Sequence, residues 1–254
     1  MAELPSSNES SPQVGLGSRK VLITGVSKGL GRALALELAS RGHTIIGCSR
    51  DQTKLDSLQA QLSNLSSTKH LLCNLDVRSN TEVEEFARAT VENELVPNII
   101  VNNAGLINRN GKMWELDAHE FDNVIDTNVK GIANVMRHFI PLMISSNKGI
   151  IINMSSMAGR DSHELIAPYC ASKWGVEGLS KAIAKEVPEG MGIVSLDPGL
   201  IYTDMLLSCL PDFAPNYQSP QHWASKAATM ILNLTALHNG ASLTVEDPGT
   251  LPNP

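Results

Sequence analysis

The sequence predicts an α/β fold: a single domain built on a doubly wound parallel sheet of about seven strands, with helices on both faces. Three observations support this prediction. Short runs of β-branched and aliphatic residues alternate with longer segments of helical periodicity. A glycine-rich turn separates the first apolar run from the first helical segment. With 254 residues and 42% hydrophobic residues, the chain can bury one large core.

Six segments are typical of buried strands, because each is a short apolar run bounded by turn residues. In chain order they are residues 20–24, 44–48, 69–73, 98–101, 149–153 and 192–196. Helices are expected at residues 32–41, 52–62, 81–94, 118–144, 167–186 and 221–237. Ser79 and Glu82 are spaced for a capping box at the start of the third helix, and Pro188 follows the end of the fifth.

The turn after the first strand reads Gly25-Val26-Ser27-Lys28-Gly29-Leu30-Gly31. A strand, a glycine loop and a helix in this order are typical of a dinucleotide site. Glycine lets the backbone approach a pyrophosphate, and the helix N-terminus offers free N–H groups. The spacing Gly-x-x-x-Gly-x-Gly departs from the Rossmann fingerprint G-x-G-x-x-G, and a tight turn without a ligand is the alternative.

Polar and turn residues follow the later strands. Residues 102–105 follow the fourth strand, 154–156 the fifth and 197–199 the sixth. Each segment alone is compatible with an ordinary turn. Because the carboxyl ends of parallel strands meet at one edge of the sheet, we expect these segments to form a ligand site together.

Tyr169 and Lys173 lie four residues apart in a helical segment and therefore share one face of it. A cation beside a phenol favours the phenolate, so Lys173 is expected to lower the pKa of Tyr169 from its usual value of about 10. A general acid for carbonyl reduction near neutral pH needs this property. The spacing alone is weak evidence, since such pairs occur by chance in many helices.

These motifs together resemble the short-chain dehydrogenase/reductase family from residue 20 to residue 245. Ser156 precedes Tyr169 by the thirteen residues that the family usually shows. The resemblance rests on residues 24–31, residues 102–105, Asn128, Ser156, the pair Tyr169 and Lys173, and residues 198–203. It implies one Rossmann-type domain at 19–247, a hydride transfer with a nicotinamide cofactor, and a small carbonyl substrate.

The resemblance also implies a role for each catalytic residue. Tyr169 protonates the carbonyl oxygen, and Ser156 donates a hydrogen bond to the same oxygen. Lys173 lowers the tyrosine pKa and holds the nicotinamide ribose, and Asn128 holds a water that links the lysine to solvent. The alternatives from the residues themselves are a turn-capping hydroxyl for Ser156 and a local helix irregularity for Asn128.

The implied cofactor contacts extend over the whole strand edge. Thr203 and the backbone at Ile201 hold the nicotinamide carboxamide, and Asp76 contacts adenine, with a turn role as its alternative. The full set is Gly25, Ser27, Lys28, Gly29, Leu30, Gly31, Arg50, Asp76, Val77, Asn103, Ala104, Gly105, Tyr169, Lys173, Pro198, Gly199, Ile201 and Thr203.

The end of the second strand favours NADP(H) over NAD(H). It reads Cys48-Ser49-Arg50, without the acid that binds the ribose 2′-OH of NAD, whereas an arginine accommodates a 2′-phosphate. Lys28 is a second cation that can reach this phosphate, and Asp51 is better placed as the N-cap of the next helix. The alternative is that both cations are solvated surface groups.

Composition excludes several other classes of protein. A net charge of −6 argues against nucleic acid as a partner, and no apolar run is long enough to cross a bilayer. Residues 1–18 are expected to be a disordered tail without signal or transit features, and residues 248–254 a second tail. The four cysteines are scattered without metal-ligand spacing, which predicts no metal site and a reducing, cytoplasmic setting.

Three segments are expected to close the substrate pocket: residues 106–115, 157–166 and 202–219. The last is expected to be a loop that acts as a lid, or that packs on the helix after it. Polar groups that could select a substrate are Arg109, Arg160, Asp161, His163 and Glu164. Residues 186–205 and 239–245 resemble plant NADPH-dependent aldehyde reductases, which implies reduction of an aldehyde or ketone, with pterin and other aromatic aldehydes as candidates.

Two other functions stay open. A 3-oxoacyl thioester reductase would need a basic surface for its acidic carrier protein, which the acidic composition does not support. A catalytically silent NADP-binding regulatory or scaffold protein would usually lack Tyr169 or Lys173. Many family members pair through the helices at 118–144 and 167–186, which implies a homodimer or homotetramer.

Overall fold

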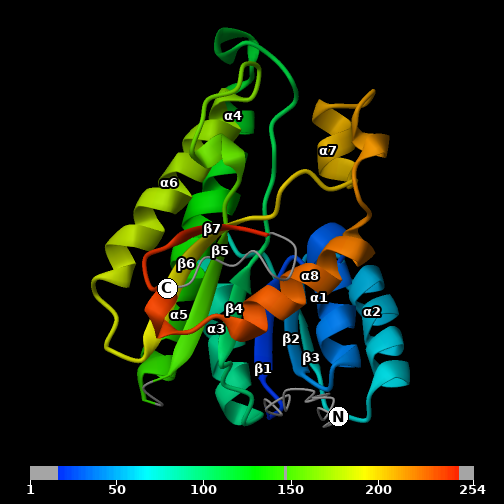
Figure 1. Ribbon diagram of the computed structural model, residues 1–254, viewed down its shortest axis with the longest axis vertical. Helices are drawn as coiled ribbons and strands as arrows, with labels where there is room; N and C mark the ends of the chain where they lie inside the picture. The colour runs from blue at the N-terminus through cyan, green and yellow to red at the C-terminus, as the bar shows by residue number, and fades with distance from the viewer. Residues whose placement is uncertain (1–16, 146–147, 246–254) are drawn as a thin grey trace, which may run out of the picture.

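The computed structural model describes residues 17–145 and 148–245. Within them, seven parallel strands form one sheet in the order β3-β2-β1-β4-β5-β6-β7, with helices on both faces (Figure 1). The predicted fold class is confirmed. Residues 1–16 and 248–254 of the predicted tails lie outside the described residues, and the domain boundaries stay predictions.

All six predicted strands are present to within two residues at either end. They are β1 Lys20–Thr24, β2 Thr44–Ser49, β3 Leu71–Asn74, β4 Ile99–Asn102, β5 Gly149–Met154 and β6 Met191–Asp197. The seventh strand, β7 Ser242–Thr244, pairs with β6 at the edge of the sheet. Its three half-buried residues are too few to show a strand pattern in the sequence.

Apart from two larger differences, the helices match the predicted segments with ends that differ by up to four residues. They are α1 Gly29–Ser40, α2 Gln52–Leu65, α3 Asn80–Glu92, α4 Ala118–Ile125, α5 Gly131–Ile144, α6 Ala167–Ala184, α7 Asp204–Cys209 and α8 Pro220–Asn233. The helix predicted at 118–144 is interrupted by a π-helical turn, Asp126–Lys130. The segment 202–219 is not a plain loop, because it contains α7 and a 3₁₀ turn, Ala214–Asn216.

Two predicted helix caps have different outcomes. Asp51 caps α2 as predicted, since its side chain accepts a hydrogen bond from the Lys54 N–H at 3.1 Å. Ser79 caps α3 by accepting from the Glu82 N–H at 3.3 Å. The capping box is not completed, however, because the Glu82 carboxylate accepts from the Asp76 N–H at 2.8 Å instead. Glu82 therefore fastens the loop after β3.

The two faces of the sheet carry separate hydrophobic cores. Helices α1, α2 and α8 cover one face, where Leu34, Leu58 and Trp223 are fully buried against the strands. Helices α3, α5 and α6 cover the other face, where the Phe86 and Phe139 rings meet edge to face (Figure 1). With both faces covered, ligands can reach the sheet only at its edges and strand ends.

Strand β1 lies between β2 and β4 near the middle of the sheet. The order of the strands along the chain reverses between β1 and β4. Helices leave in opposite directions at such a switch point, so a crevice opens beyond the carboxyl ends of the strands. The glycine loop after β1 and residues 102–105 after β4 meet at this point. The polar residues predicted to gather at the strand ends therefore do so.

Three general features of the described residues bear on function. The four cysteines are free thiols. Helices in this part of the chain are too short or too polar to span a bilayer. Over the same residues, His, Cys, Asp and Glu side chains form no group of three or more that could hold a metal ion.

We expect the protein to lose stability as the pH falls below about 6.5, because two buried histidines are neutral in the fold. The Nδ1 atoms of His43 and His70 accept hydrogen bonds from the Arg19 and Ile45 N–H groups at 3.1 and 3.0 Å. Burial lowers the pKa of both. The unfolded chain therefore binds protons first, which favours unfolding on acidification.

Urea denaturation between pH 7.5 and 5.5 measures this dependence. Replacing His43 and His70 with glutamine should flatten the change in unfolding free energy over this range. The exposed His119 supplies a matched control, since His119→Gln should leave the slope as it is. An equal slope in the double variant and the wild type would contradict the assignment.

Candidate active site

A cavity of about 430 Å³ lies in the crevice at the carboxyl ends of the strands. Its walls come from the glycine loop, the ends of β2 to β5, the start of α6 and the segment before α7. The predicted residues that line it are Gly25, Ser27, Lys28, Gly29, Leu30, Arg50, Asp76, Val77, Asn103, Ala104, Gly105, Tyr169, Lys173, Pro198 and Thr203. Residues from distant parts of the sequence thus share one site.

Three predicted cofactor residues do not line the cavity. Ile201 is 3% exposed and packs in the hydrophobic core. Gly199 adopts a φ of +77° in the turn after β6, a conformation that favours glycine. A Cβ on Gly31 would come within 2.4 Å of both Asn103 Nδ2 and Gly25 O, so this glycine permits close packing of α1 on the loop. Their contacts with a cofactor stay predictions, and burial of the Ile201 side chain does not bear on the contact predicted for its backbone.

The cavity also has walls that the sequence interpretation did not assign to the cofactor. These residues are Cys48, Ser49, Leu75, Leu106, Thr127, Met154, Ser155, Tyr202, Asp204, Met205 and Pro220. Most are direct neighbours of predicted site residues or lie in the predicted pocket segments. Position at a strand end was a usable signal for Cys48, Ser49, Leu75, Met154 and Ser155, whereas Pro220 carried none.

The glycine loop is braced by Thr24 and Asn103. The Thr24 hydroxyl accepts from the N–H groups of Asn103 and Ala104 at 3.0 and 2.9 Å. The Asn103 amide donates to the Thr24 and Gly25 carbonyls at 2.9 and 3.2 Å. Gly25 has a φ of +73°, and a Cβ there would lie 2.9 Å from the Ala104 Cα. These bonds brace the start of the loop, where Gly25 lets the two backbones approach closely.

These features fit a dinucleotide cofactor. No side chain caps the N-terminus of α1, which starts at the cavity wall, whereas side chains cap α2, α3, α7 and α8. The uncapped N–H groups and the positive end of the helix dipole suit a pyrophosphate. The residues that would hold it are Ser27, Gly29 and Leu30, which line the cavity at this helix end.

Lys28 does not point freely toward a phosphate. Its Nζ lies 2.8 Å from Asp204 Oδ2 at the start of α7, and both side chains are largely exposed. Exposed ion pairs contribute little free energy, so a phosphate dianion can compete for this ammonium group. The pair also ties the segment after β6 to the glycine loop.

Tyr169 and Lys173 lie together at the cavity wall as the helix spacing predicted. The Lys173 Nζ lies 5.4 Å from the centroid of the Tyr169 ring and donates to the Met154 carbonyl at 2.7 Å. Burial lowers the pKa of Lys173 to about 8, and the negative charge of Asp197 opposes this change. The lysine therefore stays mostly protonated near neutral pH.

The expected lowering of the Tyr169 pKa is wrong for this structure. Burial raises the pKa of Tyr169 to about 12, and a hydrogen bond with the Ser156 side chain only partly offsets it. The physical reason is that the ammonium group lies over the ring and binds Met154, while packing removes part of the water around the half-buried phenol. Tyr169 is therefore a protonated phenol across the neutral range, with a proton available to donate.

Ser156 and Asn128 support the pair from two sides. The Ser156 hydroxyl caps the 3₁₀ turn Met157–Gly159 by accepting from the Ala158 N–H at 3.2 Å. Asn128 lies fully buried in the π-helical turn, where its Oδ1 accepts from the Leu106 N–H at 2.7 Å. Its amide donates to Leu106 O and to Ser172 Oγ at 2.8 and 2.9 Å. Asn128 thus joins the strand end after β4 to α6.

The three predicted pocket segments are hydrogen-bonded to one another. The Asn110 amide donates to the Cys209 carbonyl at 2.9 Å, and the Gly111 N–H donates to the Leu165 carbonyl at 3.0 Å. The Asn108 amide also donates to Leu165 O, at 3.1 Å. These bonds hold the segments together above the cavity, whereas closure of a lid is not tested by this structure.

Two of the candidate substrate-selecting residues have structural roles instead. Arg109 binds the Glu120 carboxylate at 2.8 Å and the Glu115 carbonyl at 2.6 Å. Arg160 binds Glu177 at 3.1 Å and the β7 residues Leu243 and Thr244. Both guanidinium groups are therefore engaged by partners within the chain, although the Arg109 side chain is still 54% exposed.

Comparison with known proteins identifies the family. Residues 19–213 match the short chain dehydrogenase family. The chain belongs to the short-chain dehydrogenase family. The resemblance drawn from its motifs is confirmed, and this short-chain dehydrogenase is an oxidoreductase, as predicted.

Among its relatives is the NADPH-dependent pterin aldehyde reductase of Arabidopsis thaliana. The two are 65% identical over 230 residues, which cover 91% of this chain and 94% of the relative. The 3-oxoacyl-[acyl-carrier-protein] reductase of Staphylococcus epidermidis is 31% identical over 190 residues, which cover 74% of this chain and 77% of that relative.

Solved structures share the fold of this short-chain dehydrogenase. Levodione reductase superposes with a TM-score of 0.81 at 25% identity, covering 90% of this chain and 96% of that one. A short chain dehydrogenase from Salmonella enterica serovar Typhi gives a TM-score of 0.84 at 23% identity, and the match covers 93% of this chain and 99% of that one. These likenesses show that the chain shares the fold of these proteins.

Proposed function

We propose that this protein uses NADPH to reduce an aldehyde to the alcohol, with a pterin aldehyde as the leading substrate. The observation that carries this proposal is the 65% identity with the pterin aldehyde reductase, which extends over almost the whole of both chains. The NADPH preference that this relative implies agrees with Arg50 at the end of β2, where it lines the cavity.

Each residue of the site has a defined task in this reaction. The cofactor supplies the hydride when bound. Tyr169 donates its phenolic proton to the carbonyl oxygen, because its raised pKa keeps that proton in place at neutral pH. Ser156, which hydrogen-bonds the phenol, donates to the same oxygen as negative charge develops there. Lys173 holds positive charge beside the phenolate that Tyr169 becomes.

Part of the cavity wall suits a flat, weakly polar substrate. Leu106, Met154, Tyr202 and Met205 line this part of the cavity with apolar groups. Methionine side chains adapt to irregular shapes and contact aromatic rings favourably. An aromatic aldehyde such as a pterin aldehyde can therefore lie against Met154 and Met205 with its carbonyl near Tyr169.

NADPH oxidation by the purified protein tests the proposal. The panel should contain a pterin aldehyde, benzaldehydes, simple ketones and a 3-oxoacyl thioester, with NADH run in parallel. We expect turnover of the pterin aldehyde with NADPH and much slower turnover with NADH. Binding of NADPH without reduction of any carbonyl would instead support a silent regulatory or scaffold protein.

A 3-oxoacyl thioester reductase is the second candidate, because the Staphylococcus epidermidis relative with 31% identity has that activity by name. An acidic carrier protein would need basic groups near the pocket. The arginines nearest to the pocket segments, Arg109 and Arg160, are already paired with Glu120 and Glu177. Faster turnover of the thioester than of every aldehyde would favour this candidate.

We also propose that the protein works in the cytoplasm as a homodimer or homotetramer. Helix α6 exposes Ala171, Trp174 and Gly178 at helical spacing, and Trp174 is 54% exposed. A Cβ on Gly178 would meet no atom within 4 Å, which leaves room for a second copy to approach. Gly175, by contrast, faces Val129 of the same chain.

Trp174→Glu is expected to shift the protein toward the monomer, because a buried carboxylate without a partner is costly at an apolar interface. Size-exclusion chromatography with light scattering measures the mass directly. Arg88→Glu, on the exposed face of α3, is the control and should leave the mass unchanged. An unchanged mass in Trp174→Glu would place the interface elsewhere.

A further inference from the structure

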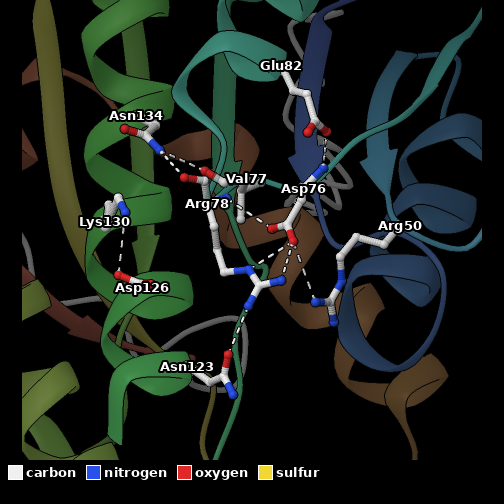
Figure 2. Close-up of polar contacts among 9 residues, drawn as sticks. All are labelled: Arg50, Asp76, Val77, Arg78, Glu82, Asn123, Asp126, Lys130 and Asn134. Atoms are coloured by element: carbon white, nitrogen blue, oxygen red, sulfur yellow. Dashed lines mark hydrogen bonds and ion pairs between the residues drawn. The ribbon is translucent and has the colours of Figure 1, made fainter. Parts of the chain in front are cut away.

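An arginine next to the cavity neutralises one of its carboxylates. The Arg78 Nε and Nη2 atoms donate to Asp76 Oδ2 at 2.8 and 2.6 Å, and the Arg78 N–H donates to Asp76 Oδ1 at 3.0 Å (Figure 2). Asp76 lines the cavity, whereas Arg78 does not. Arg78 therefore acts on the site only through Asp76.

Neighbouring helices hold Arg78 in this position. Its Nη1 donates to Asn123 Oδ1 of α4 at 2.9 Å (Figure 2). The Asn134 amide of α5 donates to the carbonyls of Val77 and Arg78 at 2.9 and 3.2 Å. Both ends of the residue are thus fixed, and the guanidinium group cannot easily swing away from Asp76.

Arg50 approaches the same carboxylate oxygen from the other side. Its Nη1 lies 3.7 Å from Asp76 Oδ2, a longer and weaker contact than those of Arg78 (Figure 2). Arg50 is 56% exposed and lines the cavity, where it is placed to meet a phosphate. Asp76 is therefore shared between a tightly bound arginine and a loosely bound one.

The charge on Asp76 matters for such a phosphate. Burial raises the pKa of Asp76, but the hydrogen bonds and charge of Arg78 more than offset this, so the carboxyl is ionised at neutral pH. An uncompensated carboxylate here would draw Arg50 into a close ion pair and would repel a phosphate dianion. The pairing with Arg78 removes both effects.

We propose that Arg78 is a positioning residue that gives the site its preference for a dinucleotide with a 2′-phosphate, by neutralising Asp76 and leaving Arg50 free to bind that phosphate. This inference rests on the proposed use of NADPH. It assigns cofactor preference partly to a residue that touches no part of the cavity.

Calorimetric titration with 2′,5′-ADP and 5′-AMP tests this without any turnover, because the two ligands differ only in the 2′-phosphate. Arg78→Gln should weaken binding of 2′,5′-ADP about tenfold, the size of one charged pair. Binding of 5′-AMP should change by less than about twofold. Adding Asp76→Asn to Arg78→Gln should restore binding of 2′,5′-ADP to within about threefold of the wild type.

Other outcomes overturn the inference. An equal loss for both ligands, or a double variant as weak as Arg78→Gln, would show that Arg78 has only a structural role. Arg78→Lys keeps the charge and should keep the preference, which provides a test if Arg78→Gln does not fold. Arg88→Gln, a remote exposed arginine, is the control. A wild type without preference for 2′,5′-ADP would instead refute the proposed cofactor, and the inference with it.

Discussion

Replacing Tyr169 with phenylalanine is expected to slow aldehyde reduction by about 10²–10⁴-fold, the usual contribution of a general acid. The change removes one hydroxyl group and keeps the ring that lies beneath the Lys173 ammonium group. Burial keeps that hydroxyl protonated at neutral pH, so its loss removes the proton donor nearest to the carbonyl oxygen. NADPH should still bind, because Tyr169 is only one of the predicted cofactor contacts and the glycine loop and Arg50 are untouched.

Single-turnover and steady-state measurements with NADPH and a pterin aldehyde give the rate constants. Binding of NADPH, followed by its fluorescence, shows whether the cofactor site is intact. Tyr217→Phe is the matched control, since this tyrosine does not line the cavity and loses the same single atom. A Tyr169→Phe variant with more than about a tenth of the wild-type rate would exclude Tyr169 as the acid.

Replacing Glu177 with alanine is expected to lower the free energy of unfolding by about 3–5 kcal/mol, the usual cost of breaking a buried charged pair. Its Oε2 accepts from Ser195 and Ser242 at 2.8 and 2.6 Å, and its Oε1 accepts from Arg160 at 3.1 Å. The side chain is only 7% exposed, so no solvent replaces these bonds. The substitution leaves Arg160 without its carboxylate and two serines without their acceptor.

Urea denaturation of the wild type and of Glu177→Ala gives the difference in unfolding free energy. Glu177→Gln keeps an acceptor for the serines but loses the charge. Its free energy of unfolding should lie between those of Glu177→Ala and the wild type. Glu186→Ala, at an exposed position just beyond the end of α6, should change stability by less than about 0.5 kcal/mol. A Glu177→Ala variant as stable as this control would mean that water or other groups replace the network.

Local pattern was sufficient for much of the fold and the site. The strands near the centre of the sheet are short apolar runs, and burial on both faces makes that pattern unavoidable. The glycine loop and the pair Tyr169 and Lys173 were recognisable because their chemistry needs particular residues at short, set spacings. The same applies to Asp51, whose cap of α2 depends only on the next three residues.

The parts that could not be predicted depend on contacts between distant residues. Arg160 is 17 residues from Glu177 and 84 from Thr244 along the chain, so its place in a predicted pocket segment could not reveal that it binds both. Helix α7 likewise carries no local period, whereas a helix irregularity at Asn128 was one of the sequence-based alternatives, and it is present as a π-helical turn.

The pKa of Tyr169 shows the same division most clearly. By itself, the sequence determined that a lysine would lie one helical turn from this tyrosine, and counting charges then favours a lower pKa. Only the tertiary structure decided how far the half-buried phenol is removed from water and that the lysine binds the Met154 carbonyl. The packing around the phenol acts as a whole, and its effect on the pKa outweighs one neighbouring charge that a short segment can encode.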